Sequence, residues 1–203
     1  MIEDRESKKC PLNTAMRSGW HGSVRDFLDC ERANWIKSLE NHLLSSLGNA
    51  ASQSNRRAWL NSHWVLQDQL ARLASRRPDI GDWGIAFEYE LPRERGRRPD
   101  VVILAGYSVL VLEFKDFKDT IPAHMDQVAA YARDLASYQS ASHDHDVIPI
   151  LVNTLSDSGP VQLDHFRSAG RTSAAYVRCS GYCWVPKTDL TSVILRGVDP
   201  AKR

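Results

Sequence analysis

The sequence lacks any apolar run long enough to cross a membrane, and its first ten residues, MIEDRESKKC, are too polar for a secretory signal or a transit peptide. Cysteine is also scarce: the four cysteines, at positions 10, 30, 179 and 183, are unevenly spaced. This distribution does not predict a disulfide framework. We therefore expect a reduced, cytoplasmic protein that has no membrane partner.

An excess of charge of one sign is lacking as well. Lysine and arginine number 26 against 25 aspartates and glutamates, which gives a net charge of +1 and no general basic signature for nucleic acid. Basic residues do cluster locally, at Arg93, Arg95, Arg97 and Arg98. Such a cluster is either a solvated loop or a phosphate-gripping segment, and its position next to the acidic residues described below favours the second.

The length and composition predict one ordinary globular domain. With 203 residues, 42% hydrophobic and 25% charged, the chain is long enough to bury a sizeable core. We expect residues 1–18 to be flexible, residues 19–80 to form a helical part of the same domain, and residues 81–203 to form its core. Apolar residues at helical spacing predict helices over residues 23–47, with a break near residue 30, and over residues 55–75.

From residue 84 onwards, β-branched and aromatic residues predict strands. Short connections favour antiparallel pairing of the first strands, and a later crossover helix allows a parallel pair. The order predicts an α/β (α+β) domain with a mixed sheet flanked by helices and an N-terminal helical extension. The expected strands are GIAFEYELP, DVVIL, SVLVLEFK, VIPILVN and SAAYVRCS, and the expected helices are PAHMDQVAAYARDLASYQS and TDLTSVILRG.

Charged residues lie at one end of the hairpin expected over residues 100–115. Side chains alternate along a strand, so Glu113 and Lys115 share one face, and the opposite face is wholly apolar and should pack on helices. Folding the chain at Gly106 and Tyr107 brings Asp100 near Lys115, with Glu113 one diagonal step away. Glu113 and Lys115 therefore converge with Asp100 at the end of the sheet.

Two adjacent carboxylates repel each other, and a divalent cation removes that repulsion. Oxygen ligands favour Mg²⁺ or Mn²⁺, and Lys115 beside them could orient or deprotonate a water molecule or offset negative charge. A short E-x-K motif alone is more often a solvated strand end with an ion pair. The Pro99-Asp100 pair at the start of the preceding strand, and the tight turn between the two strands, favour the chemical interpretation.

This arrangement of Pro99-Asp100 followed by Glu113, Phe114 and Lys115 resembles the PD-(D/E)xK nuclease superfamily, whose fold is restriction-endonuclease-like. Gln127 and Tyr131, four residues apart on the expected helix, are similar to the Q-x-x-x-Y motif of the RecB-type branch, and this spacing places both on one helical face. The stretch FEYELPRERGRRPDVVIL resembles the N-terminal nuclease-like region of bacterial helicase- or ATPase-associated proteins.

The resemblance implies a role for each residue of the motif. Asp100, Glu113 and the backbone carbonyl of Phe114 would bind the metal, and Lys115 would position or activate the attacking water. An additional upstream acid is expected: Glu88 or Glu90, which we place on one strand face, with Glu88 preferred, or else Glu31 or Glu40 on the first helix. The residues expected to contact nucleic acid or support the site are Gln127, Tyr131, Arg93, Arg97 and Arg98.

The function implied is Mg²⁺- or Mn²⁺-dependent hydrolysis of DNA phosphodiester bonds, with RNA not excluded as a substrate. The chain would then be the nuclease portion of a helicase–nuclease system in DNA repair or defence, with a helicase or ATPase partner. The sequence contains no P-loop pattern G-x-x-x-x-G-K-[ST], so such an ATPase is missing, separately encoded or unnecessary. The alternative function is a non-catalytic module on the same fold that binds nucleic acid or an ATPase partner.

Overall fold

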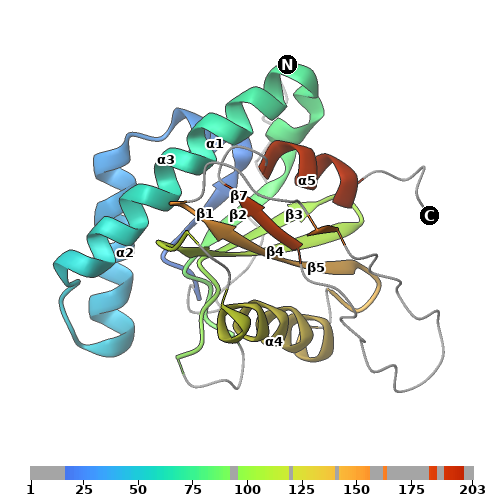
Figure 1. Ribbon diagram of the computed structural model, residues 1–203. Helices are drawn as coiled ribbons and strands as arrows, with labels where there is room; N and C mark the ends of the chain where they lie inside the picture. Colours follow the sequence, from blue (N-terminus) through green and yellow to red (C-terminus); the bar gives the residue numbers. More distant parts are fainter. Residues whose placement is uncertain are drawn as a thin grey trace, which may run out of the picture.

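A mixed sheet with helices on both faces forms the body of the protein (Figure 1). The computed structural model describes residues 17–91, 96–118, 121–139, 142–155, 162–163, 183–186 and 190–198. The elements are β1 (Trp20–Ser23), α1 (Val24–Asp29), α2 (Arg32–Leu47), α3 (Gln53–Arg76), the 3-10 helix η1 (Pro78–Asp82), β2 (Gly84–Phe87), β3 (Val101–Ala105), β4 (Ser108–Lys115), α4 (Pro122–Tyr138), β5 (Asp146–Asn153), β6 (Gln162–Leu163), β7 (Cys183–Pro186) and α5 (Leu190–Gly197).

The strand order across the sheet is β1-β2-β3-β4-β5-β7-β6. Strands β1 to β4 pair antiparallel, and β5 then pairs parallel to β4 through the crossover helix α4. The expected mixed sheet flanked by helices is therefore confirmed, as is the parallel pair after the crossover. The expected strand SAAYVRCS lies outside the described residues.

Local sequence signals account for the helix boundaries. Ser23 and Asp26 form a capping box that starts α1, and Cys30 is extended, which produces the expected break before α2. Gly48 ends α2 with a φ of 70°, a left-handed conformation that glycine adopts without steric cost. A second capping box, Ser52 with Asn55, begins α3.

The helical part of the chain is not purely helical. Trp20–Ser23 forms β1, which pairs with β2 from Trp20 opposite Phe87 to Ser23 opposite Gly84. The sequence prediction missed this strand because it is only four residues long and ends at the helix cap. Residues on both sides of the expected boundary at residue 80 thus belong to one sheet.

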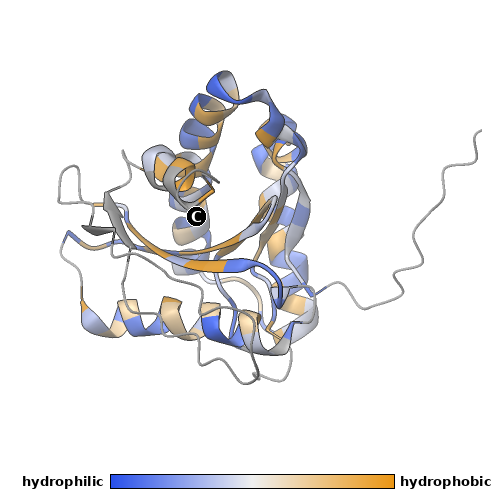
Figure 2. Cartoon of the chain, turned by 90° about the vertical axis from the view of Figure 1, so that its right-hand side faces the viewer, coloured by the Kyte–Doolittle hydropathy of each residue, from blue (hydrophilic) through white to orange (hydrophobic). Residues whose placement is uncertain are grey.

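The two faces of the sheet carry separate apolar cores, as strand alternation predicts (Figure 2). Leu110 and Leu112 face the larger core, which is formed with α1, α2, α3 and α5. Val109 and Val111 face the smaller core beneath α4. None of the described helices is both long and apolar enough to cross a membrane.

A buried histidine in the larger core makes stability depend on pH. The ring of His63 lies 5.2 Å from that of Phe27 and 4.8 Å from that of Trp35, and its Nε2 has no partner within the described residues. Burial, and to a smaller extent the charge of Arg32, lowers the pKa of His63 from its ordinary value of 6.5. Its contribution to stability is therefore complete above about pH 6.5 and is lost as the pH falls below it.

We predict that His63→Leu makes the free energy of unfolding less sensitive to acid. Between pH 7 and pH 5 the wild type should lose about 1 kcal/mol more than the variant, because the unfolded wild-type chain takes up a proton that the folded ring resists. Urea denaturation at several pH values measures this difference. Parallel curves for the two proteins would contradict the prediction, since all other titrating groups are shared.

Candidate active site

The register of the β3–β4 hairpin places the first acid of the site. Ala105 pairs with Ser108 and Val101 with Leu112, so Asp100, one residue before Val101, comes level with Glu113. The expected pairing of Asp100 with Lys115 is therefore wrong by two residues along β4, because a two-residue turn at Gly106 and Tyr107 pairs Asp100 with Glu113. The backbone N–H of Phe114 donates to Oδ2 of Asp100 at 2.7 Å and holds this carboxylate against β4.

Glu113 is the most enclosed acid of the site, with only 3% of its surface exposed. Its Oε1 accepts hydrogen bonds from Nζ of Lys115 at 2.8 Å and from Nε2 of Gln127 at 2.9 Å. Gln127 also donates to the hydroxyl of Tyr131 at 2.8 Å, so the two α4 residues do share the face that points at the site. A solvated strand end is excluded, because this carboxylate is buried among specific partners.

Glu88 enters the site from the end of β2. The expected strand stops at Phe87, and Glu88 has a φ of 52°, so the proposed common strand face of Glu88 and Glu90 does not exist. The backbone N–H of Glu88 donates to the carbonyl of Asp100 at 3.0 Å. Its Oε1 accepts from the indole N–H of Trp59 at 2.8 Å, and its Oε2 lies 3.5 Å from Arg98.

The neighbouring acidic side chains influence the ionisation of Asp100 and Glu113 at this end of the sheet. The pKa of Asp100 is raised well above its ordinary value, first by burial and then by the charges of Glu113 and Glu88. Burial also raises the pKa of Glu113, although Lys115 opposes this. Burial alone would lower the pKa of Lys115, but the attraction and hydrogen bond of Glu113 raise it above its ordinary value. Lys115 therefore stays protonated and positively charged beside Glu113.

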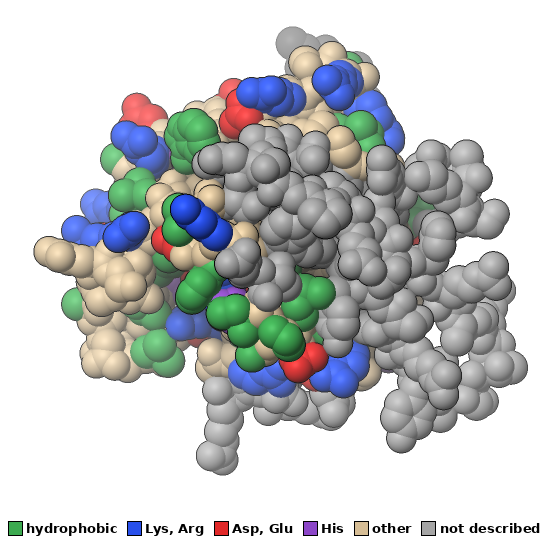
Figure 3. All heavy atoms as spheres, in the orientation of Figure 1, with side chains coloured by type: hydrophobic (Ala, Val, Ile, Leu, Met, Phe, Trp, Pro, Cys, Tyr) green, Lys and Arg blue, Asp and Glu red, His purple; other side chains and the backbone are tan. Residues whose placement is uncertain are grey.

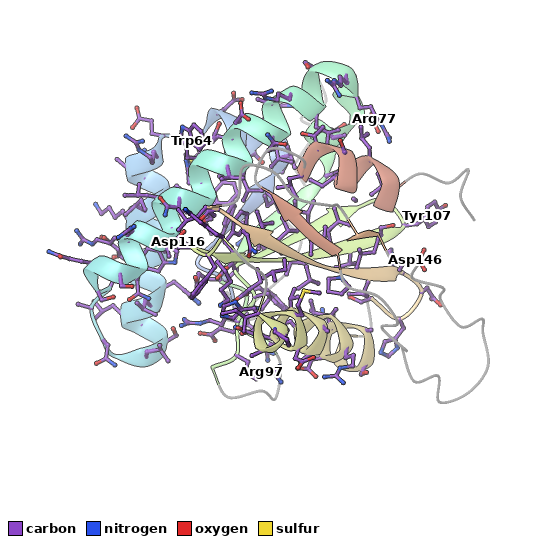
Figure 4. The ribbon with its side chains drawn as sticks, viewed as in Figure 1. Trp64, Arg77, Arg97, Tyr107, Asp116 and Asp146 are labelled. Atoms are coloured by element: carbon purple, nitrogen blue, oxygen red, sulfur yellow. The ribbon has the colours of Figure 1, made fainter. Side chains whose placement is uncertain are left out.

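A cavity of about 230 Å³ opens beside these residues, between α3 and the end of the sheet. Asp116 lies at this end of β4, and the side-chain N–H₂ of Asn61 on α3 donates to it at 3.1 Å (Figure 4). The backbone N–H of Thr154 donates to the carbonyl of Lys115 at 2.9 Å and closes the β5 side. The lining residues that bear on the chemistry are Glu88, Asp100, Phe114, Lys115 and Asp116.

The free oxygens of the site fit a magnesium-type cation. In the described part of the chain, Oε2 of Glu113 is buried and makes no hydrogen bond of good geometry, although the nearby Asp100 backbone N–H opposes the rise in the pKa of this carboxylate. Oδ1 of Asp100 accepts no hydrogen bond there either. Mg²⁺ commonly uses one or two carboxylates and fills its remaining positions with water. Across the described residues, no three His, Cys, Asp or Glu side chains form a ready-made metal cage. Asp100 and Glu113 are therefore the donor pair available.

Two of the expected phosphate-gripping arginines, Arg97 and Arg98, have partners within the protein. Arg97 pairs with Asp134 at 2.8 Å, and its guanidinium lies over the Tyr131 ring, 5.2 Å from the centroid (Figure 4). Arg98 pairs with Glu88. Arg93 and Arg95 lie outside the described residues.

The alternative upstream acids do not reach the cavity. Glu40 pairs with Arg56 at 2.7 Å, and Glu31 accepts from Asn34 on its own helix. Glu90 pairs with His42 at 3.4 Å. Only Glu88 among these candidates lines the cavity with Asp100. The preference for Glu88 thus agrees with its position, although its supposed strand geometry was wrong.

Sequence reasoning missed the contribution of α3. Trp59 is one of the apolar residues at helical spacing within residues 55–75; it is buried, and its indole also donates to an acid of the site. Asn61, two residues later, contacts Asp116. The signal available was chemical, since a buried indole N–H requires an acceptor, but nothing in the sequence identifies that acceptor as Glu88.

Comparison of the chain with protein-family models, with curated proteins and with solved structures finds no match.

We predict that Asp100→Asn stabilises the metal-free protein. Because burial and the charges of Glu113 and Glu88 raise the folded-state pKa of Asp100, the stability present below its ordinary pKa of 3.8 is lost as the pH rises through the raised pKa. Asparagine carries no charge but can still accept from the Phe114 N–H. The free energy of unfolding at pH 8 should rise by about 1 kcal/mol, and the gain should shrink as the pH falls towards 4.

Chemical denaturation with a chelator present measures this effect, with the exposed Asp82→Asn as a matched control. Unchanged or reduced stability of Asp100→Asn would contradict the prediction.

We also predict that Glu88→Gly is more stable than Glu88→Ala by about 1 kcal/mol. Both changes remove the same hydrogen bonds, but only glycine adopts a φ of 52° without steric cost. At Lys37, in the interior of α2, Lys37→Ala should instead be more stable than Lys37→Gly, because alanine is the better helix former. Thermal unfolding of the four variants tests this, and the same order at both positions would refute it.

Proposed function

We propose that this protein is a Mg²⁺-dependent nuclease of PD-(D/E)xK type that hydrolyses DNA phosphodiester bonds. The observation that carries the proposal is the pair of acids, Asp100 and Glu113, level with each other at a sheet end, with Lys115 bonded to Glu113. The element order β2-β3-β4-α4-β5 agrees with a restriction-endonuclease-like core. Gln127 and Tyr131 support it further, because both lie beside the acids.

Each residue of the site has a distinct task in this reaction. Asp100 and Glu113 would hold the metal, which supplies Lewis-acid activation of the phosphate and of an attacking water. The Phe114 N–H fixes the orientation of Asp100, and Gln127 fixes that of Glu113. Lys115, kept as a cation, orients the water or offsets the negative charge that develops on the phosphate.

The basic character of α3 supports nucleic acid as the substrate. This helix borders the cavity and carries four arginines against one aspartate, with Arg56 paired to Glu40 and Arg72 paired to Asp68. Basic side chains gather along the upper and left edge of the face in Figure 3. Unpaired positive charge on this helix would attract a phosphate backbone without reading its sequence. DNA is the substrate proposed, and RNA is an outcome of the assay. A helicase-type ATPase partner is proposed on the resemblance alone, since the sequence carries no P-loop pattern.

We predict that Lys115→Met and Asp100→Asn each reduce DNA cleavage by about 100-fold or more, because each removes a group that acts on the reacting phosphate or its metal. Single-stranded, linear and supercoiled DNA, and RNA, should be tested with Mg²⁺, with Mn²⁺ and with EDTA. Lys37→Met, an exposed lysine on α2, serves as the matched control.

Equal rates for the control and the two site variants, or cleavage that survives EDTA, would refute the nuclease assignment. A wild type that binds DNA without metal and never cleaves it would instead identify a binding module on this fold.

A further inference from the structure

Glu88 is held in place from three directions. Its Oε1 accepts from the Trp59 indole of α3, its Oε2 faces Arg98, and its backbone N–H donates to the carbonyl of Asp100. The indole contact, at 2.8 Å, is a full hydrogen bond, whereas the Arg98 contact, at 3.5 Å, is at the limit of one. The Trp59 bond is therefore the contact that sets where this carboxylate lies.

The backbone of Glu88 provides independent support for this role. Among the described residues, Glu88 is the one non-glycine residue with a positive φ. A side chain in the left-handed region is strained, and such strain persists only where the surroundings impose the conformation, often at functional sites. The conformation turns the chain out of β2 and towards the cavity that Glu88 shares with Asp100.

We propose that Trp59 is a positioning residue, which holds the charge of Glu88 beside Asp100, one of the two carboxylates that would bind the divalent cation. The inference rests on the metal site of the proposed function. Trp59 does not touch the substrate in this account. Its indole N–H keeps Glu88 beside Asp100, so that the negative charge of Glu88 adds to the attraction of the site for a cation before the cation arrives.

A second polar residue of α3, Asn61, contacts another acid that lines the cavity. Asn61 donates to both carboxylate oxygens of Asp116 at 3.1 Å, directly after Lys115 in the chain. One helix thus contacts acids on two sides of the cavity, from β2 and from β4. The position of α3 therefore controls the spacing of the acids, which a purely apolar packing helix would not do.

A double-mutant cycle on Mn²⁺ binding, measured by calorimetry on the full chain without DNA, tests the inference. The four proteins are the wild type, Trp59→Phe, Glu88→Ala and the double variant. Phenylalanine keeps an aromatic ring in the core but removes the N–H. We expect Trp59→Phe to weaken Mn²⁺ binding about tenfold in the wild type and by less than twofold in Glu88→Ala. Trp64→Phe, on the same helix but 64% exposed, should leave the affinity unchanged.

Equal weakening in both backgrounds, or none in either, would overturn the positioning role. Its failure and that of the proposed function are distinguishable. If Trp59 and Glu88 are coupled in a protein that cleaves no nucleic acid, the positioning role stands and the nuclease assignment fails. If their effects are additive in a protein that cleaves DNA, the nuclease assignment stands and the positioning role fails. A wild type that binds no Mn²⁺ overturns the positioning role and the metal site together.

If Trp59→Phe fails to fold, the wild type still provides a test through the indole N–H signals in a ¹H–¹⁵N spectrum. Titration with Mg²⁺ should shift the Trp59 signal, because its acceptor carboxylate gains a cation neighbour, and should leave the Trp64 signal in place. An unmoved Trp59 signal at Mg²⁺ concentrations that saturate the site would overturn the inference.

Discussion

The mutual repulsion of two carboxylates at the end of one β-hairpin is the constraint on which the site depends. Asp100 and Glu113 come level because their strands are joined by a two-residue turn, and both lie where water is scarce. Burying charge in this way is costly unless it is compensated. The Phe114 N–H, the Lys115 cation and the Gln127 amide provide partial compensation, and each comes from an element that the fold brings to this edge.

The compensation is incomplete, and that incompleteness distinguishes a working site from a structural ion pair. In a structural pair, Lys115 alone would neutralise Glu113, and the remaining oxygens would find hydrogen-bond donors. Here the buried Oε2 of Glu113 makes no hydrogen bond of good geometry within the described residues, and a second and a third acid stand beside it. Polar atoms that are buried and unsatisfied are uncommon in native proteins, and a bound cation is one partner that would satisfy this oxygen.

The sequence predicted those parts of the site that follow from periodicity. Alternation along a strand placed Glu113 and Lys115 on one face, and helical spacing placed Gln127 and Tyr131 on another. The partner of Asp100 was missed by two residues along β4, because the expected turn at Gly106 and Tyr107 in fact pairs Asp100 with Glu113 and not with Lys115. The position of Glu88 could not be predicted, since its left-handed backbone ends a strand that the residue pattern would continue.

The contacts of α3 with the site could not be predicted from the spacing of apolar residues either, but for a different reason. The pattern of apolar residues predicts correctly that Trp59 is buried. It does not identify the acceptor of the indole N–H, Glu88, which is 29 positions away in the sequence. Only the packing of α3 against the sheet end brings the two together. The same packing brings Asn61 to Asp116, so the helical N-terminal part is a wall of the site and not an appendage to it. A change in how α3 packs would therefore move the acids, even if the hairpin that carries two of them stayed intact.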